Sequence, residues 1–275
     1  MSTQFKASGV ITVTTDFGHR GPFVGTMKGV IISRFAQARI IDLTHEVYVH
    51  WPAEAGFWIA RSYHYFPVGS VHLAIVDPGV GTDRSVLLAV GDGHAFLAPD
   101  NGLLAEVVEA TGATVRHVPN ELIARYSLGE PSATFHGRDI FAPLAAAIAS
   151  GELNVESCGE PSEEFIPSIV EPPELRAGNL RGMVITCDHF GNLISNIGRA
   201  DLATIRDPVV HAGGHDIRIG RTYADASPGE LLALINSFGM LEIARSEQSA
   251  AEFLGLGRGA PLRVTQFNTP QGSND

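Results

Sequence analysis

The sequence predicts an α/β protein with an N-terminal, mainly parallel sheet flanked by helices and a smaller, β-barrel-like C-terminal domain. Three observations predict it. Apolar strands alternate with helical patterns in the first half, a stretch rich in proline and acidic residues follows, and the second half consists of short strands separated by turn residues. The chain of 275 residues is long enough for one large or two modest domains with a substantial core.

The first half begins with Val10–Thr15, a run of β-branched residues that predicts a buried strand. Pro22 then opens a helical pattern with Met27 and Ile31 on its apolar face. The other expected elements are strands Arg39–Leu43 and Val71–Val76, a hairpin of Ser85–Val90 and His94–Ala98, and helices from Pro52 to about Tyr63, over Asn101–Ala110 and over Ile140–Ala149. This alternation favours a mainly parallel sheet.

The segment Gly151–Gly182 carries several proline and acidic residues with little periodicity, which indicates an interdomain connection. We therefore expect an N-terminal domain over residues 1–165, a linker over 166–180 and a C-terminal domain over 181–275. The strands expected after it are Gly182–Cys187, Val209–His211, Asp216–Ile219, Leu231–Asn236, Leu241–Ala244 and Leu262–Gln266, with one short helix over Ser249–Leu254. Short strands of this spacing are typical of a small sandwich or barrel.

The composition excludes several classes of function. A formal net charge of −11 disfavours binding to nucleic acid. Cys158 and Cys187 show neither metal-ligand spacing nor a disulfide framework, which is typical of a cytoplasmic protein with reduced thiols. The first residues lack the apolar core of a signal peptide, and no apolar run approaches the ~20 residues that span a bilayer. We expect no membrane association.

Candidate catalytic side chains follow the predicted strands of the first half. Asp16 and Asp77 stand directly after strands, where open α/β sheets bind ligands, although such aspartates also serve as turn or cap residues. Arg84 ends the glycine-rich loop after Asp77, and His136 precedes Asp139, which we expect to cap the next helix. Asp16, His19, Asp77 and His136 together could form a metal site, but no metal-ligand motif or nucleotide loop is present, and we expect neither metal nor cofactor.

In the second half, the segment Cys187–Asn196 gathers hydrogen-bonding side chains around one aromatic residue. Phe190 could stack on a nucleobase, and the amide of Asn192 could read its donor–acceptor edge. A polar β-turn is the simpler interpretation of the same residues.

Seven motifs in order give the sequence its resemblance to a known family. They are Thr14-Thr15-Asp16-Phe17-Gly18, Asp42-Leu-Thr-His45, Val76-Asp77-Pro-Gly-Val-Gly81 with Arg84, Ala98-Pro-Asp-Asn-Gly102, Phe135-His136-Gly137-Arg138-Asp139, Asp188-x-Phe190-Gly191-Asn192, and Asn236-Ser237-Phe238-Gly239 with Glu242-Ile-Ala244. Over nearly its whole length the chain resembles the S-adenosylmethionine hydrolases (hydroxide adenosyltransferases), which are relatives of the fluorinating and chlorinating enzymes. The resemblance implies a homotrimer whose active sites lie between the N-terminal domain of one subunit and the C-terminal domain of its neighbour.

The resemblance also implies a role for each candidate residue. Asp77, Arg84 and His136 match the set that distinguishes the hydrolases: Asp77 would accept the proton of the attacking water, Arg84 would orient Asp77, and His136 would fix the water. The expected substrate contacts are Asp16 to the ribose diol, Phe190 and Asn192 to adenine, Asp188 and Ser237 to the methionine amino and carboxylate groups, and Arg245 near the adenine.

Two departures and three rivals bear on this interpretation. The halogenating relatives have a different residue at Asp77, and the stretch His50-Trp51-Pro52 differs from the family pattern, so Trp51 receives no role. A halogenase, a non-catalytic adenosine or S-adenosylmethionine sensor and a metal-dependent hydrolase are the alternatives. A fixed carboxylate at Asp77 would repel a halide ion, and a sensor would not need Asp77, Arg84 and His136.

Overall fold

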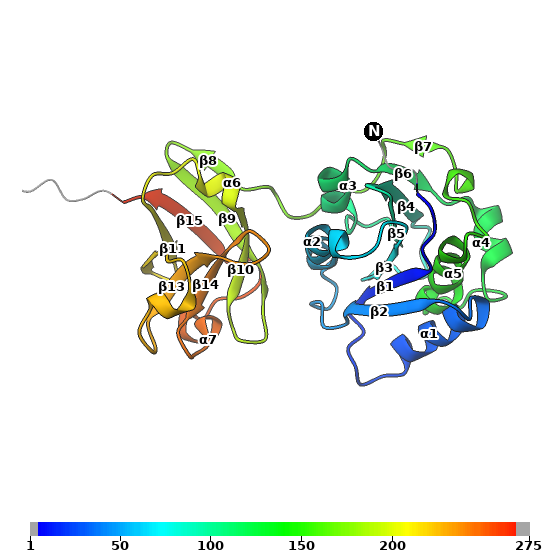
Figure 1. Ribbon diagram of the computed structural model, residues 1–275, viewed down its shortest axis with the longest axis horizontal. Coiled ribbons are helices and arrows are strands. Elements are labelled where there is room, and N and C mark those ends of the chain that lie inside the picture. Colours follow the sequence, from blue (N-terminus) through cyan, green and yellow to red (C-terminus); the bar gives the residue numbers. More distant parts are fainter. Residues whose placement is uncertain (1–4, 268–275) are drawn as a thin grey trace, which may run out of the picture. The chain divides into compact units, whose positions relative to one another are not determined.

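The computed structural model describes residues 5–267, which form two compact units divided after Val170, within the stretch expected as a linker (Figure 1). Each unit has its own sheet and its own hydrophobic core. The predicted α/β class is confirmed. Among these residues no helix has the length and hydropathy needed to cross a membrane.

The N-terminal unit contains a seven-stranded sheet in the order β2-β1-β3-β5-β4-β6-β7. Strands β1, β2, β3 and β5 are parallel neighbours, while β4, β6 and β7 pair antiparallel. The strands are β1 Val10–Thr15, β2 Arg39–Thr44, β3 Val71–Ile75, β4 Val86–Gly91, β5 His94–Pro99, β6 Thr114–His117 and β7 Pro161–Ser162. The sheet is therefore mixed, with a parallel half that carries the first two candidate aspartates.

Helices cover both faces of this sheet. They are α1 Phe23–Arg34, α2 Pro52–Ser62, α3 Ala105–Thr111, α4 Asn120–Tyr126 and α5 Ala142–Ser150. Successive residues of β3 point to opposite faces: Leu73 packs in the cluster that contains residues of α1 and α5, and Ala74 in the one that contains residues of α2 and α3. Burial on both faces explains why central strands such as β4 are continuous apolar runs rather than alternating ones, whereas β2 at the edge is largely exposed.

Several element boundaries differ from the predictions. The helix predicted over Asn101–Ala110 is α3, which begins at Ala105. It does not begin at Asn101 because the Asn101 side chain donates to the Val76 carbonyl and accepts from the Leu103 amide. Asp139 does not cap a helix, so that prediction was wrong. It lies inside a π-helical turn, Gly137–Phe141, and its carboxylate accepts from the Ser132 amide and the Arg138 guanidinium.

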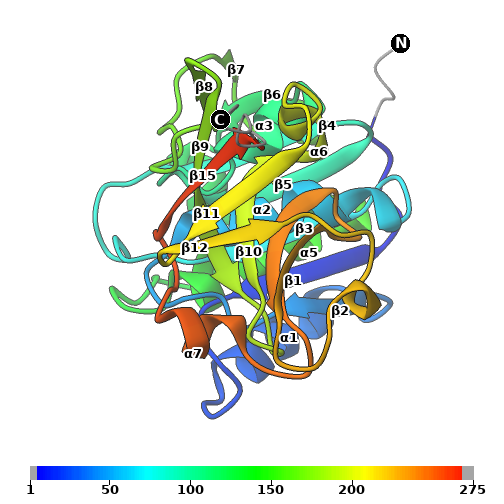
Figure 2. The ribbon, with the colours of Figure 1, turned by 90° about the vertical axis from the view of Figure 1, so that its left-hand side faces the viewer.

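The C-terminal unit is an eight-stranded antiparallel sheet in the order β12-β11-β15-β9-β10-β14-β13, with β8 paired to β9. Figure 2 labels β8, β9, β10, β11, β12 and β15 of this sheet. A bridge between Ile219 and Ala233 brings the two end strands together, so the sheet is nearly closed and the predicted barrel-like fold is confirmed. The elements are β8 Glu174–Arg176, β9 Asn179–Cys187, β10 Leu193–Gly198, α6 Arg199–Leu202, β11 Pro208–Ala212, β12 His215–Arg218, β13 Leu231–Ile235, β14 Met240–Arg245, α7 Ala250–Leu254 and β15 Pro261–Gln266.

Residues 151–182 are more ordered than their composition indicates. Pro161–Ser162 adds a short strand to the edge of the first sheet beside β6, and Glu174–Arg176 pairs with β9 in the second sheet. The segment therefore contributes an edge strand to each unit.

Candidate active site

Asp16 and Asp77 lie at the same edge of the first sheet. Asp16 follows β1 and Asp77 comes two residues after β3, and these strands are adjacent and parallel, with Thr15 opposite Ile75. The carboxyl ends of parallel neighbours point the same way, which places both aspartates where α/β sheets bind their ligands.

Asp77, Arg84 and His136 form one hydrogen-bonded group. Arg84 Nε donates to Asp77 Oδ1 at 2.7 Å and to Oδ2 at 2.8 Å, and its Nη2 also donates to Oδ2. The same Nη2 lies 3.1 Å from His136 Nδ1. The Asp77 and Arg84 side chains are 5% and 9% exposed, so this ion pair is shielded from screening by solvent. Arg84 and His136, which lie 52 positions apart in sequence, thus meet in the fold.

Gly81 allows the two loops of this group to approach each other. Its φ is +81°, and a Cβ at this position would lie 2.3 Å from the Ala133 carbonyl oxygen. A backbone atom cannot move aside as a flexible side chain can. The Asp77–Arg84 loop therefore reaches the His136 loop only because this residue is glycine.

The contact with Arg84 sets the protonation state of His136. A guanidinium can only donate, so Nδ1 must accept and the ring proton resides on Nε2. Burial lowers the pKa of His136, and the nearby Arg84 charge lowers it further against the opposing effects of Asp77 and Asp139. At neutral pH the ring is neutral and offers an N–H donor at Nε2.

Asp16 lies outside this group. Its Oδ2 accepts from the backbone amide of His50 at 3.0 Å, and within residues 5–267 no hydrogen bond or ion pair joins it to Asp77, Arg84 or His136. The interaction comes from the stretch His50-Trp51-Pro52, in which the sequence assigned no role to Trp51. His19 lies 3.8 Å from Glu46. Across the described residues, no group of three or more His, Cys, Asp or Glu side chains is arranged to hold a metal ion.

In the C-terminal unit, the segment after β9 is a turn built around Asp188. The Asp188 carboxylate accepts from the amides of Phe190 and Asn192, both at 2.9 Å, and from the Asn192 side chain at 3.0 Å. These contacts hold the Phe190 ring 75% exposed beside the buried Asn192. The segment is thus a polar turn, and the turn presents an aromatic face next to an amide.

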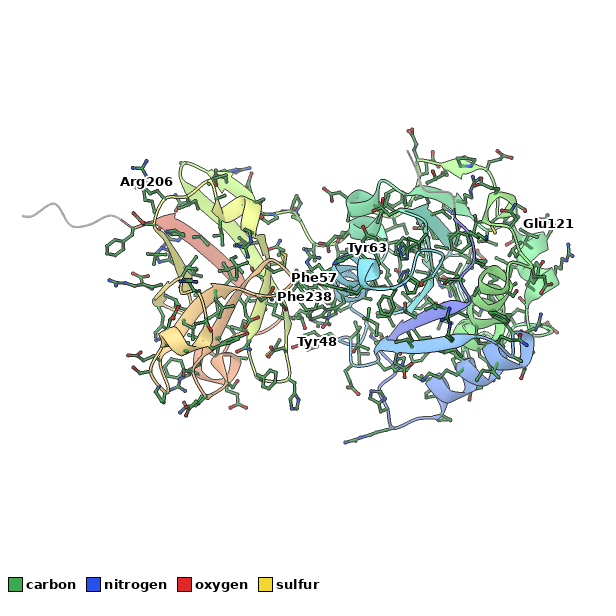
Figure 3. The ribbon with its side chains drawn as sticks, in the orientation of Figure 1. Tyr48, Phe57, Tyr63, Glu121, Arg206 and Phe238 are labelled. Atoms are coloured by element: carbon green, nitrogen blue, oxygen red, sulfur yellow. The ribbon has the colours of Figure 1, made fainter. Side chains whose placement is uncertain are left out.

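Ser237 lies on the turn between β13 and β14 in the same unit. Asn236 shapes this turn by accepting from the amides of Phe238 and Met240, and it leaves Ser237 and Phe238 exposed. Phe238 is labelled in Figure 3. Arg245, at the end of β14, donates to the Gly229 carbonyl and stacks 3.9 Å over the Phe253 ring. Its guanidinium is therefore held against the barrel.

Sequence reasoning gave no role to Glu242, although it stands in a quoted motif. Its side chain is 2% exposed and accepts from Tyr223 Oη at 2.6 Å and from Asn236 Nδ2 at 3.2 Å. Burial raises the pKa of Glu242 despite these two hydrogen bonds, and the charge on Asp188 raises it further. The Ser237 turn is thus tied to a buried carboxylate that lies within electrostatic reach of the Asp188 turn.

Comparison with known proteins identifies the family of the chain. Residues 11–159 match the model of the SAM hydroxide adenosyltransferase N-terminal domain, and residues 182–263 match that of the C-terminal domain. An (R)-S-adenosyl-L-methionine hydrolase of Salinispora tropica is 39% identical, covering 93% of this chain and 97% of its own length. A fluorinase of Actinoplanes sp. is 29% identical, covering 94% and 97%.

A solved structure gives the same result for the fold. An uncharacterized conserved protein from Thermotoga maritima superposes with a TM-score of 0.85 at 33% identity, covering 93% of this chain and all (100%) of that one. Together the two matched domains span more than half of the chain. The chain belongs to the SAM hydroxide adenosyltransferase family.

Proposed function

We propose that the protein hydrolyses S-adenosyl-L-methionine to adenosine and L-methionine, by in-line attack of water or hydroxide at C5′. The observation that carries this proposal is the group of Asp77, Arg84 and His136, which offers a carboxylate acceptor and an imidazole N–H donor near one another. Names of relatives such as the Salinispora tropica hydrolase support it.

The chemistry needs a positioned nucleophile more than a leaving-group catalyst. The sulfonium departs as a neutral thioether: the new O–C5′ bond forms, the C5′–S bond breaks, and its electron pair goes to sulfur. Asp77 accepts the water proton, and His136 Nε2–H holds the water oxygen from a second direction. Arg84 fixes both oxygens of Asp77, so the carboxylate cannot rotate away. Such positioning is worth several kcal/mol of barrier, on the order of 7–11 kcal/mol at its best.

The remaining candidates would bind the substrate. Asp16 would accept hydrogen bonds from both ribose hydroxyls, since one carboxylate can serve two donors. Phe190 would stack on adenine while Asn192 reads its edge. Asp188 and Ser237 would bind the methionine amino and carboxylate groups, with Arg245 on the adenine side.

We further propose a homotrimer in which a neighbouring subunit supplies the C-terminal residues of each active site, as in the family that the motifs resemble. A cytoplasmic location fits the two free cysteines, and the acidic net charge of −11 disfavours a nucleic-acid partner. A halogenase is disfavoured because the Asp77 carboxylate would repel the halide.

The test is hydrolysis in ¹⁸O-labelled water without halide, analysed by mass spectrometry. The expected products are adenosine labelled at the 5′ oxygen and unlabelled methionine. Unlabelled adenosine would contradict attack by water at C5′. If S-adenosylmethionine is recovered intact from the protein, the sensor is the better account, and product formation that requires chloride or fluoride would favour the halogenase.

A further inference from the structure

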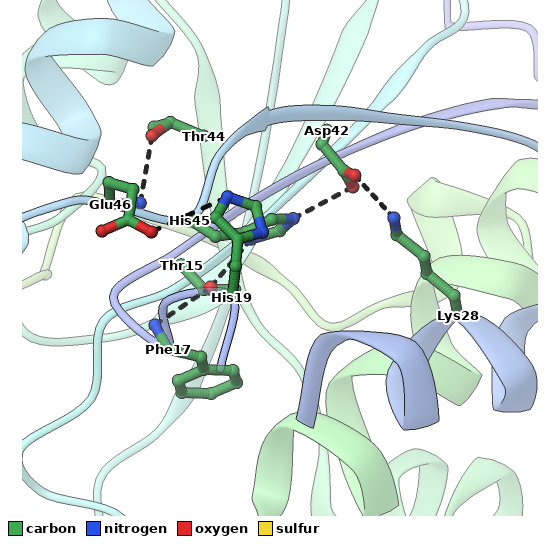
Figure 4. Close-up of polar contacts among 8 residues, drawn as sticks. All are labelled: Thr15, Phe17, His19, Lys28, Asp42, Thr44, His45 and Glu46. Atoms are coloured by element: carbon green, nitrogen blue, oxygen red, sulfur yellow. Dashed lines mark hydrogen bonds and ion pairs between the residues drawn. The ribbon is translucent and has the colours of Figure 1, made fainter. Parts of the chain in front are cut away.

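Beside Asp16 lies a polar network with a buried centre and a partly exposed outer end, which the proposed reaction does not use. Its centre is His45, which is 1% exposed (Figure 4). His45 Nδ1 is 2.9 Å from Thr15 Oγ1, and His45 Nε2 is 3.0 Å from Asp42 Oδ1. Asp42 in turn accepts from Lys28 Nζ at 2.6 Å. The network joins the ends of β1 and β2 to helix α1.

The proton positions in this network follow from its partners. Burial alone would raise the pKa of Asp42, but the hydrogen bond from Lys28, the contact with His45 and the charge of Lys28 hold it below its ordinary value. An ionised carboxylate can only accept, so it favours the His45 tautomer with its proton on Nε2. Nδ1 then accepts from the Thr15 hydroxyl, whose oxygen accepts in turn from the Phe17 amide at 3.2 Å.

His45 therefore holds the loop that carries Asp16 at two points. Its ring is bonded to Thr15, the residue before Asp16, and its carbonyl oxygen accepts from the Gly18 amide at 2.8 Å. A second loop, residues 45–51, begins at His45 and contacts Asp16 again through the His50 amide at 3.0 Å. His50 has a φ of 59°, a left-handed conformation that is unfavourable for a non-glycine residue and so must be held by its surroundings.

From these contacts we infer that His45 is a positioning residue: through Thr15 and Gly18 it fixes the Asp16 carboxylate in the orientation that reads the ribose diol. This rests on the proposed function of Asp16. Asp42 fixes the tautomer of His45 through Oδ1, and Lys28 donates to the other carboxylate oxygen, Oδ2. Because Asp16 would recognise two hydroxyls at once, a small rotation of its loop lowers discrimination between ribose and deoxyribose before it affects any other contact.

Two substitutions at His45 test its contacts with Thr15 and with Asp42 separately. In His45→Asn the Oδ1 atom takes the place of Nδ1 and keeps the Thr15 contact; in His45→Gln the terminal amide replaces Nε2 and keeps only the Asp42 contact. The probes are adenosine and 2′-deoxyadenosine, measured by calorimetry. We expect H45Q to bind adenosine about tenfold more weakly, with little change for 2′-deoxyadenosine. The ratio of the affinities for adenosine and 2′-deoxyadenosine should stay close to the wild-type value in H45N and be unchanged in Lys28→Met.

An H45Q protein with the wild-type ratio of affinities, or with equal losses for both nucleosides, would overturn the inference, since an equal loss means general damage to the fold. If H45Q shows no cooperative thermal transition, the same ratio is measured for Thr15→Val and Thr15→Ser. T15V should lose discrimination and T15S should keep it, whereas equal ratios in these two would also overturn the inference. Failure of wild-type hydrolysis in labelled water would instead remove the proposed function while leaving the binding ratio measurable.

Discussion

At the scale of single residues, Arg84 connects the two groups that would hold the nucleophile. It satisfies both oxygens of Asp77 and at the same time donates to His136 Nδ1. A lysine has no planar fork and cannot make these contacts together. The geometry of the acceptor and of the donor therefore depends on one guanidinium.

Replacing Asp77 by asparagine should lower kcat by about 10²–10⁴-fold, because the proton acceptor is lost while the shape of the side chain is kept. The KM for S-adenosylmethionine should change much less, since Asp77 would contact the water rather than the substrate. Steady-state kinetics check this, with a thermal melt to confirm folding. A change in KM alone would instead make Asp77 a substrate-binding residue.

Replacing Arg84 by lysine should lower kcat nearly as far as Asp77→Asn does, although the positive charge is retained. Arg138→Lys is the matched control, since Arg138 pairs with Asp139 rather than with Asp77. Activity of R84K close to that of the wild type would show that charge, and not the fork, is what Asp77 requires.

The protonation state of His136 predicts the acid limb of the pH–rate profile. Burial and the Arg84 charge put the pKa of His136 below its ordinary value of 6.5. As pH falls through this lowered pKa, a proton enters Nδ1 and breaks the contact with Arg84. We expect activity to be constant from neutral pH down to below pH 6.5 and then to fall. An acid limb centred above 6.5 in single-turnover measurements, or an unchanged limb in His136→Asn, would assign the titration to another group.

At the scale of elements, a row of polar side chains crosses the interior of the first sheet. Thr12 of β1 bonds to His72 of β3 at 2.9 Å, and His72 Nε2 lies 3.1 Å from His94 Nδ1 of β5. Burial, and to a smaller extent the neighbouring His94, lower the pKa of His72 to about 3. Both rings are nearly inaccessible to solvent, at 1% and 3% exposure.

This row predicts a loss of stability in acid. The folded state keeps His72 neutral down to a pKa of about 3, whereas the unfolded chain takes up a proton near 6.5. The unfolded state thus binds more protons between these values, so stability is complete above 6.5 and declines below it by about 1.4 kcal/mol per pH unit for this residue. Urea unfolding at several pH values should give a smaller slope for His72→Gln. Equal slopes in the two proteins would contradict this account.

The elements that sequence reasoning found are those with a strong local signal, such as β1 and β3, which are continuous runs buried on both faces. It missed β6, α4 and β10 because their signals are short or mixed. In β10 the polar Ser195 is fully buried, with its hydroxyl donating to the Leu241 carbonyl on β14. Only the neighbouring strand makes that polar residue acceptable in the core, and local patterns do not contain it.

The candidate site was also only partly predictable from the sequence. The motifs identified the side chains, but the meeting of Asp77, Arg84 and His136 depends on how two loops pack across Gly81. The contribution of His50 to Asp16 is made by a backbone amide, which no residue type can signal. His45 and Asp42 stood in a quoted motif, and only their distances to Thr15 and to each other indicate what they do.

At the scale of the whole molecule, the candidate residues fall into two sets, one on each unit, and each unit is a continuous stretch of the chain. Asp16, Asp77, Arg84 and His136 lie before Val170, and the proposed adenine and methionine contacts lie after it. If neighbouring subunits share each site, as we propose, a trimer mixed from two inactive variants contains some intact sites.

Mixing Asp77→Asn with Asn192→Ala should therefore restore activity after the two proteins are unfolded and refolded together, while neither is active alone. A random mixture of subunits sets an upper limit of about one quarter of wild-type activity, because two independent choices must both be favourable. Sedimentation of the wild type checks the trimer independently. No recovery from a mixture that sediments as trimers would indicate that each subunit builds its site alone.

The chain passes from the N-terminal unit to the C-terminal unit once, after Val170. This junction determines which residues a recombination event would exchange together. A gene fused at this junction to the second half of another family member inherits Asp77, Arg84 and His136 as one intact block. Such a chimaera would keep its choice of nucleophile and its contact with the ribose, and take its preference among nucleobases from the new half. One recombination event could therefore change which substrate is recognised without rebuilding the chemistry.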